Sequence, residues 1–146
     1  MSENVNQTNL FGQYVPAGSY QNSSSNISVT INAQCKRFDG GVIPSTLTFT
    51  TDVAVVIDDI ENRDGKLLML AGKDPSQPNP TNLFGQYVPA GSYQNSSSDI
   101  SITLNAACEQ TGGNVVQSPA LTFLATDVTT ISDIENREGT LKIINA

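Results

Sequence analysis

The stretch that decides the fold is NISVTINAQC, residues 26–35. Its apolar residues Ile27, Val29 and Ile31 alternate with polar ones, and Ala33 and Cys35 continue the same spacing. A period of two residues is typical of a strand with one face buried and the other in water. We therefore predict a β-strand whose apolar side chains face a core.

The same pattern occurs a second time, in DISITLNAAC at residues 99–108. The segments before the two strands, residues 8–25 and 81–98, are identical and read TNLFGQYVPAGSYQNSSS. After the strands, DDIENRDGKL at residues 58–67 matches SDIENREGTL at residues 132–141. The chain is thus a tandem duplication. It presents each surface group twice, an arrangement that gives binding proteins avidity for repetitive ligands.

The duplication divides the 146 residues into four parts. We predict a flexible tail at 1–7, a first repeat at 8–70, a proline-rich linker at 71–80 and a second repeat at 81–146. Each repeat alone buries only a thin core, so we expect the two to form one compact domain with two lobes. Exchange of strands about the linker would make a domain-swapped dimer the alternative to a monomer.

Further strands are expected downstream of the first one in each repeat. The segments IENRDGKL and IENREGTL place a polar turn between apolar residues, and a type I turn followed by a left-handed Gly would close a hairpin there. No long amphipathic helix is indicated, and we predict an all-β fold. The residues assigned to the second strands are Leu47, Phe49 and the β-branched run 53–57, then Leu121, Phe123 and the run 128–131.

Charge and composition exclude several classes of partner. A net charge of −7 disfavours nucleic acid and anionic membrane surfaces, which require clustered cations. No apolar stretch is long enough for membrane insertion, and no secretion signal is visible at the start of the sequence. One cysteine per repeat favours a reducing compartment such as the cytoplasm, with secretion as the alternative. A neutral polar ligand suits this surface.

The chemistry of the side chains argues against catalysis. The chain contains no histidine, which removes the usual general base and zinc ligand. The acidic segment DDIENRDG, residues 58–65, lacks the ligand spacing of an EF-hand calcium loop and is typical of a solvated turn. We therefore predict no enzyme activity, no catalytic residue, no cofactor and no metal. A hydrolase that uses carboxylates is the minor alternative.

The two cysteines and the SYQNSSS segments each have a structural interpretation as well as a functional one. Cys35 and Cys108 continue the apolar phase of their strands, which favours buried, inert thiols over reactive ones. The segments at residues 19–25 and 92–98 are dense in hydroxyls and amides. Such groups suit sugar hydroxyls, but they equally suit a polar loop that caps its own backbone. Composition alone leaves the two open.

The order of motifs resembles that of the cyanovirin-N homologues. The segments GSYQNSSSNISVTINAQC with IENRDGKL, and GSYQNSSSDISITLNAAC with IENREGTL, are similar to the two repeats of that family. The resemblance covers residues 18–70 and 91–144. It implies a cyanovirin-N-like fold with two pseudo-symmetric lobes, each a three-stranded sheet plus a hairpin, with strands exchanged between the repeats. It also implies a lectin that binds high-mannose glycans or glycoproteins without metal.

The resemblance further implies two non-identical sugar sites that mix residues from both repeats. We expect the better mannose site to follow Cys108, because family sites commonly carry an acid followed by polar residues at that point. Glu109, Gln110 and Thr111 fit this pattern, and Lys36-Arg37-Phe38 does not. The expected stronger site comprises Glu61, Asn62, Asp64, Asn95, Ser96, Glu109, Gln110 and Thr111. The expected weaker site comprises Asn22, Ser23, Lys36, Asn136, Arg137 and Glu138.

Two departures from the family pattern affect these expectations. Ser24 and Ser97 stand where the family has half-cystines that pair, within a repeat, with the positions of Cys35 and Cys108. Both disulfides are therefore absent, and each would have contributed about 2–4 kcal/mol. The extra segments TNLFGQYVPA could cover the lobes or mediate self-association. The alternative function is accordingly a structural or protein-interaction module of the same fold that has lost sugar binding.

Overall fold

The computed structural model of the chain describes residues 14–54, 57–71, 83–84 and 87–145. The predicted tail at residues 1–7 lies outside these ranges, as does nearly all of the predicted linker at 71–80. Both stay predictions.

The described chain consists of strands joined by turns and single helical turns, so the predicted all-β class is confirmed. Two 3-10 turns, η1 (Ser19–Asn22) and η2 (Ser92–Asn95), lead into the long strands β1 (Ser24–Lys36) and β5 (Ser97–Glu109). The first repeat continues with β2 (Val42–Thr50), α1 (Thr51–Ala54), β3 (Ile57–Arg63) and β4 (Lys66–Ala71). The second continues with β6 (Val115–Gln117), β7 (Leu121–Leu124), η3 (Ala125–Thr130), β8 (Ile131–Arg137) and β9 (Thr140–Asn145).

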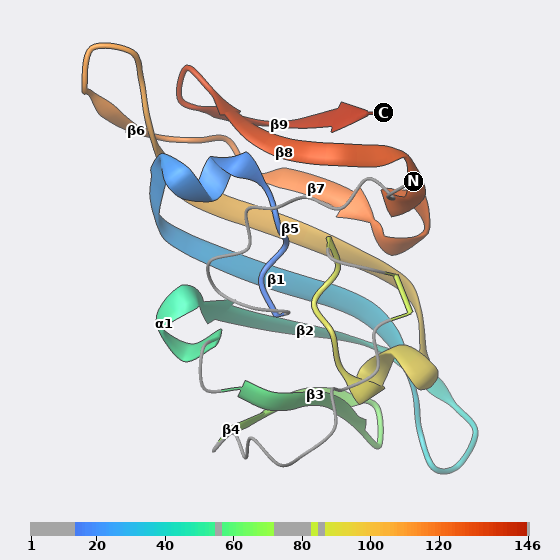
Figure 1. Cartoon of the computed structure of the whole chain (residues 1–146). Helices are drawn as coiled ribbons and strands as arrows, with labels where there is room; N and C mark the ends of the chain where they lie inside the picture. Colours follow the sequence, from blue (N-terminus) through green and yellow to red (C-terminus); the bar gives the residue numbers. More distant parts are fainter. Residues whose placement is uncertain (1–13, 55–56, 72–82, 85–86, 146) are drawn as a thin grey trace.

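The two long strands pair with each other and join the repeats (Figure 1). They run antiparallel, with Val29 opposite Leu104 and Ile31 opposite Ile102. β2 extends the sheet beyond β1, and β6 and β7 extend it beyond β5, which gives one five-stranded sheet. The resemblance implied a separate three-stranded sheet in each lobe, and the β1–β5 pairing replaces these with a single sheet. The hairpins β3–β4 and β8–β9 are two-stranded sheets of their own.

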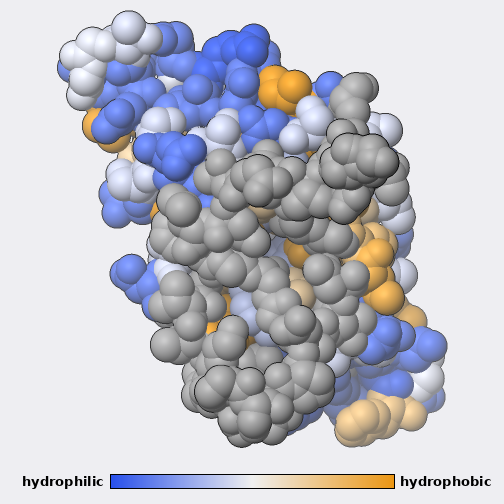
Figure 2. All heavy atoms as spheres, viewed as in Figure 1, coloured by the Kyte–Doolittle hydropathy of each residue, from blue (hydrophilic) through white to orange (hydrophobic). Residues whose placement is uncertain are grey.

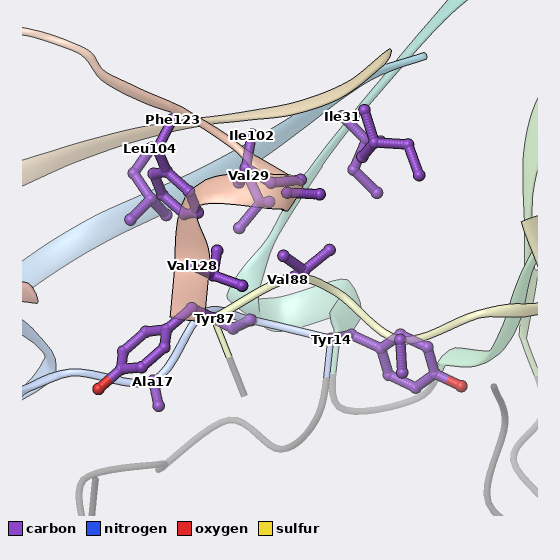
Figure 3. Close-up of a cluster of buried hydrophobic side chains, with 14 of the residues drawn as sticks. Tyr14, Ala17, Val29, Ile31, Tyr87, Val88, Ile102, Leu104, Phe123 and Val128 are labelled. Carbon is purple, nitrogen blue, oxygen red and sulfur yellow. The ribbon is translucent and has the colours of Figure 1, made fainter. Parts of the chain in front are cut away.

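The inner face of this sheet carries the core. Along β1 and β5, every second residue from Ile27 and Ile100 onward is buried, as the period of two predicts. Figure 3 shows sheet residues such as Val29 and Leu104 facing Val88, which precedes η2. Tyr14 and Tyr87 are buried as well, at 2% and 3% exposure. The described ends of the LFGQY segments therefore cover the core, while Leu10 and Phe11 lie outside the described residues.

The outer face of the sheet carries many hydroxyl and amide groups. Thr30 on β1 stands opposite Thr48 on β2 and Thr103 on β5, which in turn stands opposite Thr122 on β7. The Oγ1 atoms of Thr30 and Thr48 are 2.9 Å apart. Those of Thr103 and Thr122 are also 2.9 Å apart. The sheet is thus apolar on one face and polar on the other, with the charged residues Lys36 and Glu109 at the ends of β1 and β5.

Each hairpin packs against the 3-10 turn of the other repeat. The backbone N–H of Ser92 donates to Asp59 Oδ1 at 2.9 Å, and that of Ser19 donates to Asp133 Oδ1 at 2.8 Å. The approach is close at Gly91, where a Cβ would lie 2.5 Å from the carbonyl oxygen of Ile60. Contacts between the repeats therefore hold both hairpins in place.

One part of the strand prediction is wrong. The β-branched runs at 53–57 and 128–131 are not continuous strands, because Val53 lies in α1 and Val128 lies in η3. The chain must leave the sheet at these points to reach a hairpin, and one helical turn provides the change of direction. Asp52 and Asp127 lie in the first turns, where a negative charge is favourable. Here the tertiary path overrides the strand propensity of valine.

Candidate functional site

The sites expected from the sequence lie at the two ends of the β1–β5 pair. β1 has 13 residues, so its two ends are roughly 40 Å apart at about 3.3 Å per residue. We call end A the cluster formed by residues 36–42, 62–65 and 95–98, and end B the cluster formed by residues 109–115, 136–139 and 22–25. Figure 1 shows end A beside η2 and the β1–β2 loop, and end B beside η1 and the β5–β6 loop.

Asn62 organises end A. Its Nδ2 atom donates to the carbonyl oxygen of Lys36 at 2.9 Å and to Ser96 Oγ at 2.9 Å. Its Oδ1 atom accepts the N–H of Gly65 at 2.8 Å, which fixes its own hairpin turn. The side-chain amide of Asn62 is therefore hydrogen-bonded to the end of β1, to the start of β5 and to the β3–β4 turn.

The β3–β4 turn also holds the β1–β2 loop. Asp64 and Gly65 have φ values of 52° and 94°, and both lie between the paired residues Arg63 and Lys66. The predicted hairpin is therefore confirmed, but its turn has two residues with positive φ, as in type I′, rather than a type I turn followed by Gly. This turn directs Asp64 Oδ1 at the N–H of Phe38, at 2.8 Å. Arg37 Nε lies 3.9 Å from the same carboxylate.

End A contains a cavity of about 190 Å³. It is smaller than the roughly 300 Å³ at which sites for drug-sized ligands begin, and it suits a single small polar ring. Residues 95–98 line one side. The other side is formed by Gln34, Lys36 and Val42. Hydroxyl and amide groups from two strands therefore surround an open cavity at the end of the sheet.

Asn136 organises end B in the same manner. Its Nδ2 atom donates to the carbonyl oxygen of Glu109 at 2.8 Å and to Ser23 Oγ at 2.9 Å. Its Oδ1 atom accepts the N–H of Gly139 at 2.8 Å. The hydrogen bonds of Asn136 at end B thus repeat those of Asn62 at end A, and we call each set the frame of its end.

The loop of end B is held differently. The carboxylate of Glu138 accepts both the N–H and the hydroxyl of Thr111, the former at 3.2 Å. The side chain of Gln110 donates to the carbonyl oxygen of Glu138 at 3.3 Å. The side chains of Gln110 and Thr111, both expected to bind sugar, are therefore already bonded to Glu138 within the protein, Gln110 to its backbone carbonyl and Thr111 to its carboxylate.

The grouping of site residues made from the sequence is wrong in one respect. Asn62, Asp64, Asn95 and Ser96 do meet, but Glu109, Gln110 and Thr111 lie at end B with Asn22, Ser23, Asn136 and Glu138. Lys36 lies at end A. The cause is the antiparallel β1–β5 pairing, which sets Cys35 opposite Ser97 and Cys108 opposite Ser24. The loop after each long strand therefore meets the segment that begins the other.

Glu61 and Arg137 have a different environment from their neighbours Asn62 and Asn136. Glu61 forms an ion pair with Arg63, and Arg137 forms one with Glu135 at 2.5 Å. Because residues two apart share a face of a strand, these pairs lie on the face of each hairpin opposite its Asn. Glu61 therefore lies outside end A, and the guanidinium of Arg137, a residue of end B, pairs with Glu135 instead of the polar side chains of that end.

The site residues expected from the sequence did not include Gln34, Val42 or the loop residue Phe38, and Ser97 and Ser98 entered only as part of the hydroxyl-rich segment 92–98. Gln34 and Ser98 stand opposite each other in the β1–β5 ladder, and this pairing brings both to the cavity. The polar phase of β1 places Gln34 on the outer face. Ser98 falls in the apolar phase of β5 and stands opposite Gln34 only because the register shifts by one residue near Asp99, whose φ is 50°. Placing both residues at the cavity required the strand register, which the local sequence does not give.

The same register decides the partners of the cysteines. The hydroxyl of Ser24 lies 3.3 Å from Cys108 Sγ, and that of Ser97 lies 3.5 Å from Cys35 Sγ. The cysteine–serine pairs therefore link the two repeats, in contrast to the pairing within a repeat that the resemblance implied. Both thiols are buried and unbridged. Cys35 and Cys108 stand roughly 35 Å apart along the pair, which excludes a bond between them.

The identical 3-10 turns η1 and η2 each contain a buried tyrosine whose hydroxyl is hydrogen-bonded. The hydroxyls of Tyr20 and Tyr93 donate to the carbonyl oxygens of Pro16 and Pro89, each at 2.6 Å. Burial is the main cause that raises the pKa of both phenols well above the usual value. These tyrosines are therefore neutral structural groups at physiological pH.

In the described part of the chain, no group of three or more histidine, cysteine, aspartate or glutamate residues could hold a metal ion. Within the same residues, no helix has the length and apolar character that a membrane crossing requires.

Comparison with known proteins leaves the family unassigned. No protein-family model, no curated protein and no solved structure matches this chain.

Proposed function

We propose that the protein is a metal-independent lectin, and not an enzyme, that binds mannose-rich oligosaccharides at the two ends of its sheet. The observation that carries this proposal is the cavity of about 190 Å³ at end A, lined by the amides of Gln34 and Asn95 and by serine hydroxyls. Vicinal sugar hydroxyls donate and accept hydrogen bonds at once, and amides and hydroxyls offer both functions. The resemblance of the motifs to cyanovirin-N homologues supports mannose as the sugar.

End A is proposed as the principal site and end B as the second. At end B, Glu138 already accepts two hydrogen bonds from Thr111, so a sugar must compete with them. At end A, Asp64 accepts from a backbone N–H, and the side chains of residues 95–98 line the cavity. This order reverses the one expected from the sequence, because Glu109, Gln110 and Thr111 do not lie with Asn95.

The duplication supplies a matched pair of variants for the test. Asn22 and Asn95 occupy the same position in identical segments, and both are exposed. We expect Asn95→Ala to weaken binding of mannobiose about tenfold or more, and Asn22→Ala to leave the principal site unchanged. The measurement is a titration followed by amide chemical shifts, which reports each end separately. Addition of a chelator should leave the titration unchanged.

The outcomes separate the candidate functions. If mannobiose and longer mannose oligosaccharides shift no amide at either end, the protein does not bind mannose-rich glycans. That result would favour the alternative, a protein-interaction module of the same architecture. Cleavage of the oligosaccharide during the titration would contradict the non-enzymatic part of the proposal.

A further inference from the structure

The β1–β2 loop carries an aromatic ring that the polar contacts of end A do not use. The side chain of Phe38 is 87% exposed, more than any other large hydrophobic side chain in the described part of the chain. Val42 and Ile43, on the next strand, are 52% and 37% exposed. Among the residues that the structure describes, three of the six exposed large hydrophobic residues therefore belong to the β1–β2 hairpin. In Figure 2 an apolar group stands, among hydrophilic ones, at the extremity where Figure 1 draws this loop.

The backbone of the loop fixes where this ring starts. The N–H of Arg37 donates to the carbonyl oxygen of Gly41 at 2.7 Å, and that of Gly40 donates to Arg37 at 3.0 Å. Lys36 and Val42, which flank the loop, both line the cavity. The Cα of Phe38 lies within roughly 7 Å of the Cα of Lys36, because each residue spans at most about 3.6 Å. The ring therefore originates at the rim of the cavity.

The contact with the β3–β4 turn fixes the orientation of the loop without burying the ring. The N–H of Phe38 is held by Asp64 at 2.8 Å, while its side chain remains in solvent. Of the two β2 residues, Val42 lines the cavity, whereas Ile43 is directed at Gly65 on the opposite side of the strand. Phe38 and Val42 thus place exposed apolar surface next to a polar cavity, a combination typical of a binding surface. A pyranose ring is amphipathic in the same way, with hydroxyls at its edge and C–H bonds on one face.

We propose that Phe38 is the apolar platform of end A and determines its specificity for sugars with an accessible C–H face. The amides and hydroxyls of the cavity bind the edge of the pyranose, and the ring of Phe38 covers its apolar face. This inference rests on the proposed lectin function. End B has Thr111 at the position of Phe38, and its hydroxyl bonds to Glu138, so end B has no such platform at this position.

The experiment compares Phe38→Ala, Phe38→Trp and Thr111→Ala in amide-shift titrations with mannobiose. We expect Phe38→Ala to raise the dissociation constant at end A about tenfold, which corresponds to about 1.4 kcal/mol. Thr111→Ala is the matched control and should leave end A unchanged. Because the side chain of Phe38 is exposed, the urea midpoint of Phe38→Ala should equal that of the unmodified protein.

Phe38→Trp adds an independent readout, because the chain contains no tryptophan. Its emission should shift to the blue as mannobiose is added, since the indole passes from water to a sugar face. If the unmodified protein binds mannobiose at end A and Phe38→Ala binds it equally well, the inference is wrong and the lectin function stands. If the unmodified protein binds at neither end, both fail. If the tryptophan emission of Phe38→Trp changes with protein concentration and not with added sugar, position 38 contacts another protein molecule and the inference is wrong.

Discussion

Ends A and B have the same frame and different loops. In both, an asparagine of the hairpin donates to a serine hydroxyl of one repeat and to a backbone carbonyl that ends a long strand. The carbonyls belong to Lys36 and Glu109, two residues of opposite charge. A frame that contacts only the backbone at this position leaves the side chain free to vary. The comparison shows how a duplicated chain can repeat a scaffold while changing the chemistry of its sites.

The largest effect should come from the glycines that let the hairpins approach. Gly18 and Gly91 have φ values of 152° and 150°, and a Cβ on either would lie within 2.6 Å of a carbonyl oxygen of the opposite hairpin. We expect Gly18→Ala and Gly91→Ala each to lower the free energy of unfolding by about 4 kcal/mol, measured in urea. Gly40→Ala, at φ 92° with open space around it, is the control and should cost about 1 kcal/mol. Unequal losses at the two glycines would break the equivalence of the ends.

A disulfide can test the pairing that assigns each loop to its end. Ser97 stands directly opposite Cys35 in the β1–β5 ladder, so Ser97→Cys should form a bond between the repeats. We expect about 2–4 kcal/mol of added stability under oxidising conditions, lost on reduction. Ser24→Cys should form the corresponding bond with Cys108. Peptide mapping by mass spectrometry identifies the partners, and a bond from position 97 to Cys108 would contradict the register.

Alkaline pH should act on both ends alike through Tyr20 and Tyr93. Burial raises the pKa of both phenols above the unfolded value of about 10, so the folded state holds these protons more tightly. Their contribution is complete below pH 10 and declines above it, by about 1.4 kcal/mol per pH unit for each tyrosine. Unfolding followed by phenolate absorbance should report this loss. A Tyr93→Phe variant should show about half the pH dependence, and an unchanged slope would contradict the assignment.

The sequence predicted where strands and turns lie better than it predicted which strands pair. The alternation at Ile27, Val29 and Ile31 identified β1, and the DG and EG pairs identified the two hairpin turns. Both signals are local, since they depend on the residues of a single strand or turn. The runs at 53–57 and 128–131 failed because a change of chain direction is a property of the fold as a whole.

The cavity of end A could not be assembled from the sequence for a related reason. β1 and β5 carry the same pattern, so periodicity gives no register between them and does not reveal that they pair. The regrouping of Lys36 with Ser96, and of Glu109 with Ser23, follows entirely from that pairing. In the sequence, Phe38 is visible only as a departure from the family pattern, because its role depends on which side chains surround it.

The smallest effect should distinguish how the two loops are held. Asp64→Ala removes the acceptor of the Phe38 N–H, and Glu138→Ala removes the acceptor of the Thr111 N–H and hydroxyl. Because both carboxylates are exposed, we expect each change to lower the free energy of unfolding by no more than about 1 kcal/mol. Amide hydrogen exchange is the sharper measurement: Asp64→Ala should speed exchange at Phe38 only, and Glu138→Ala at Thr111 only. Faster exchange at both loops in either variant would mean that the ends are coupled through the sheet, and the two sites could then no longer be treated as independent.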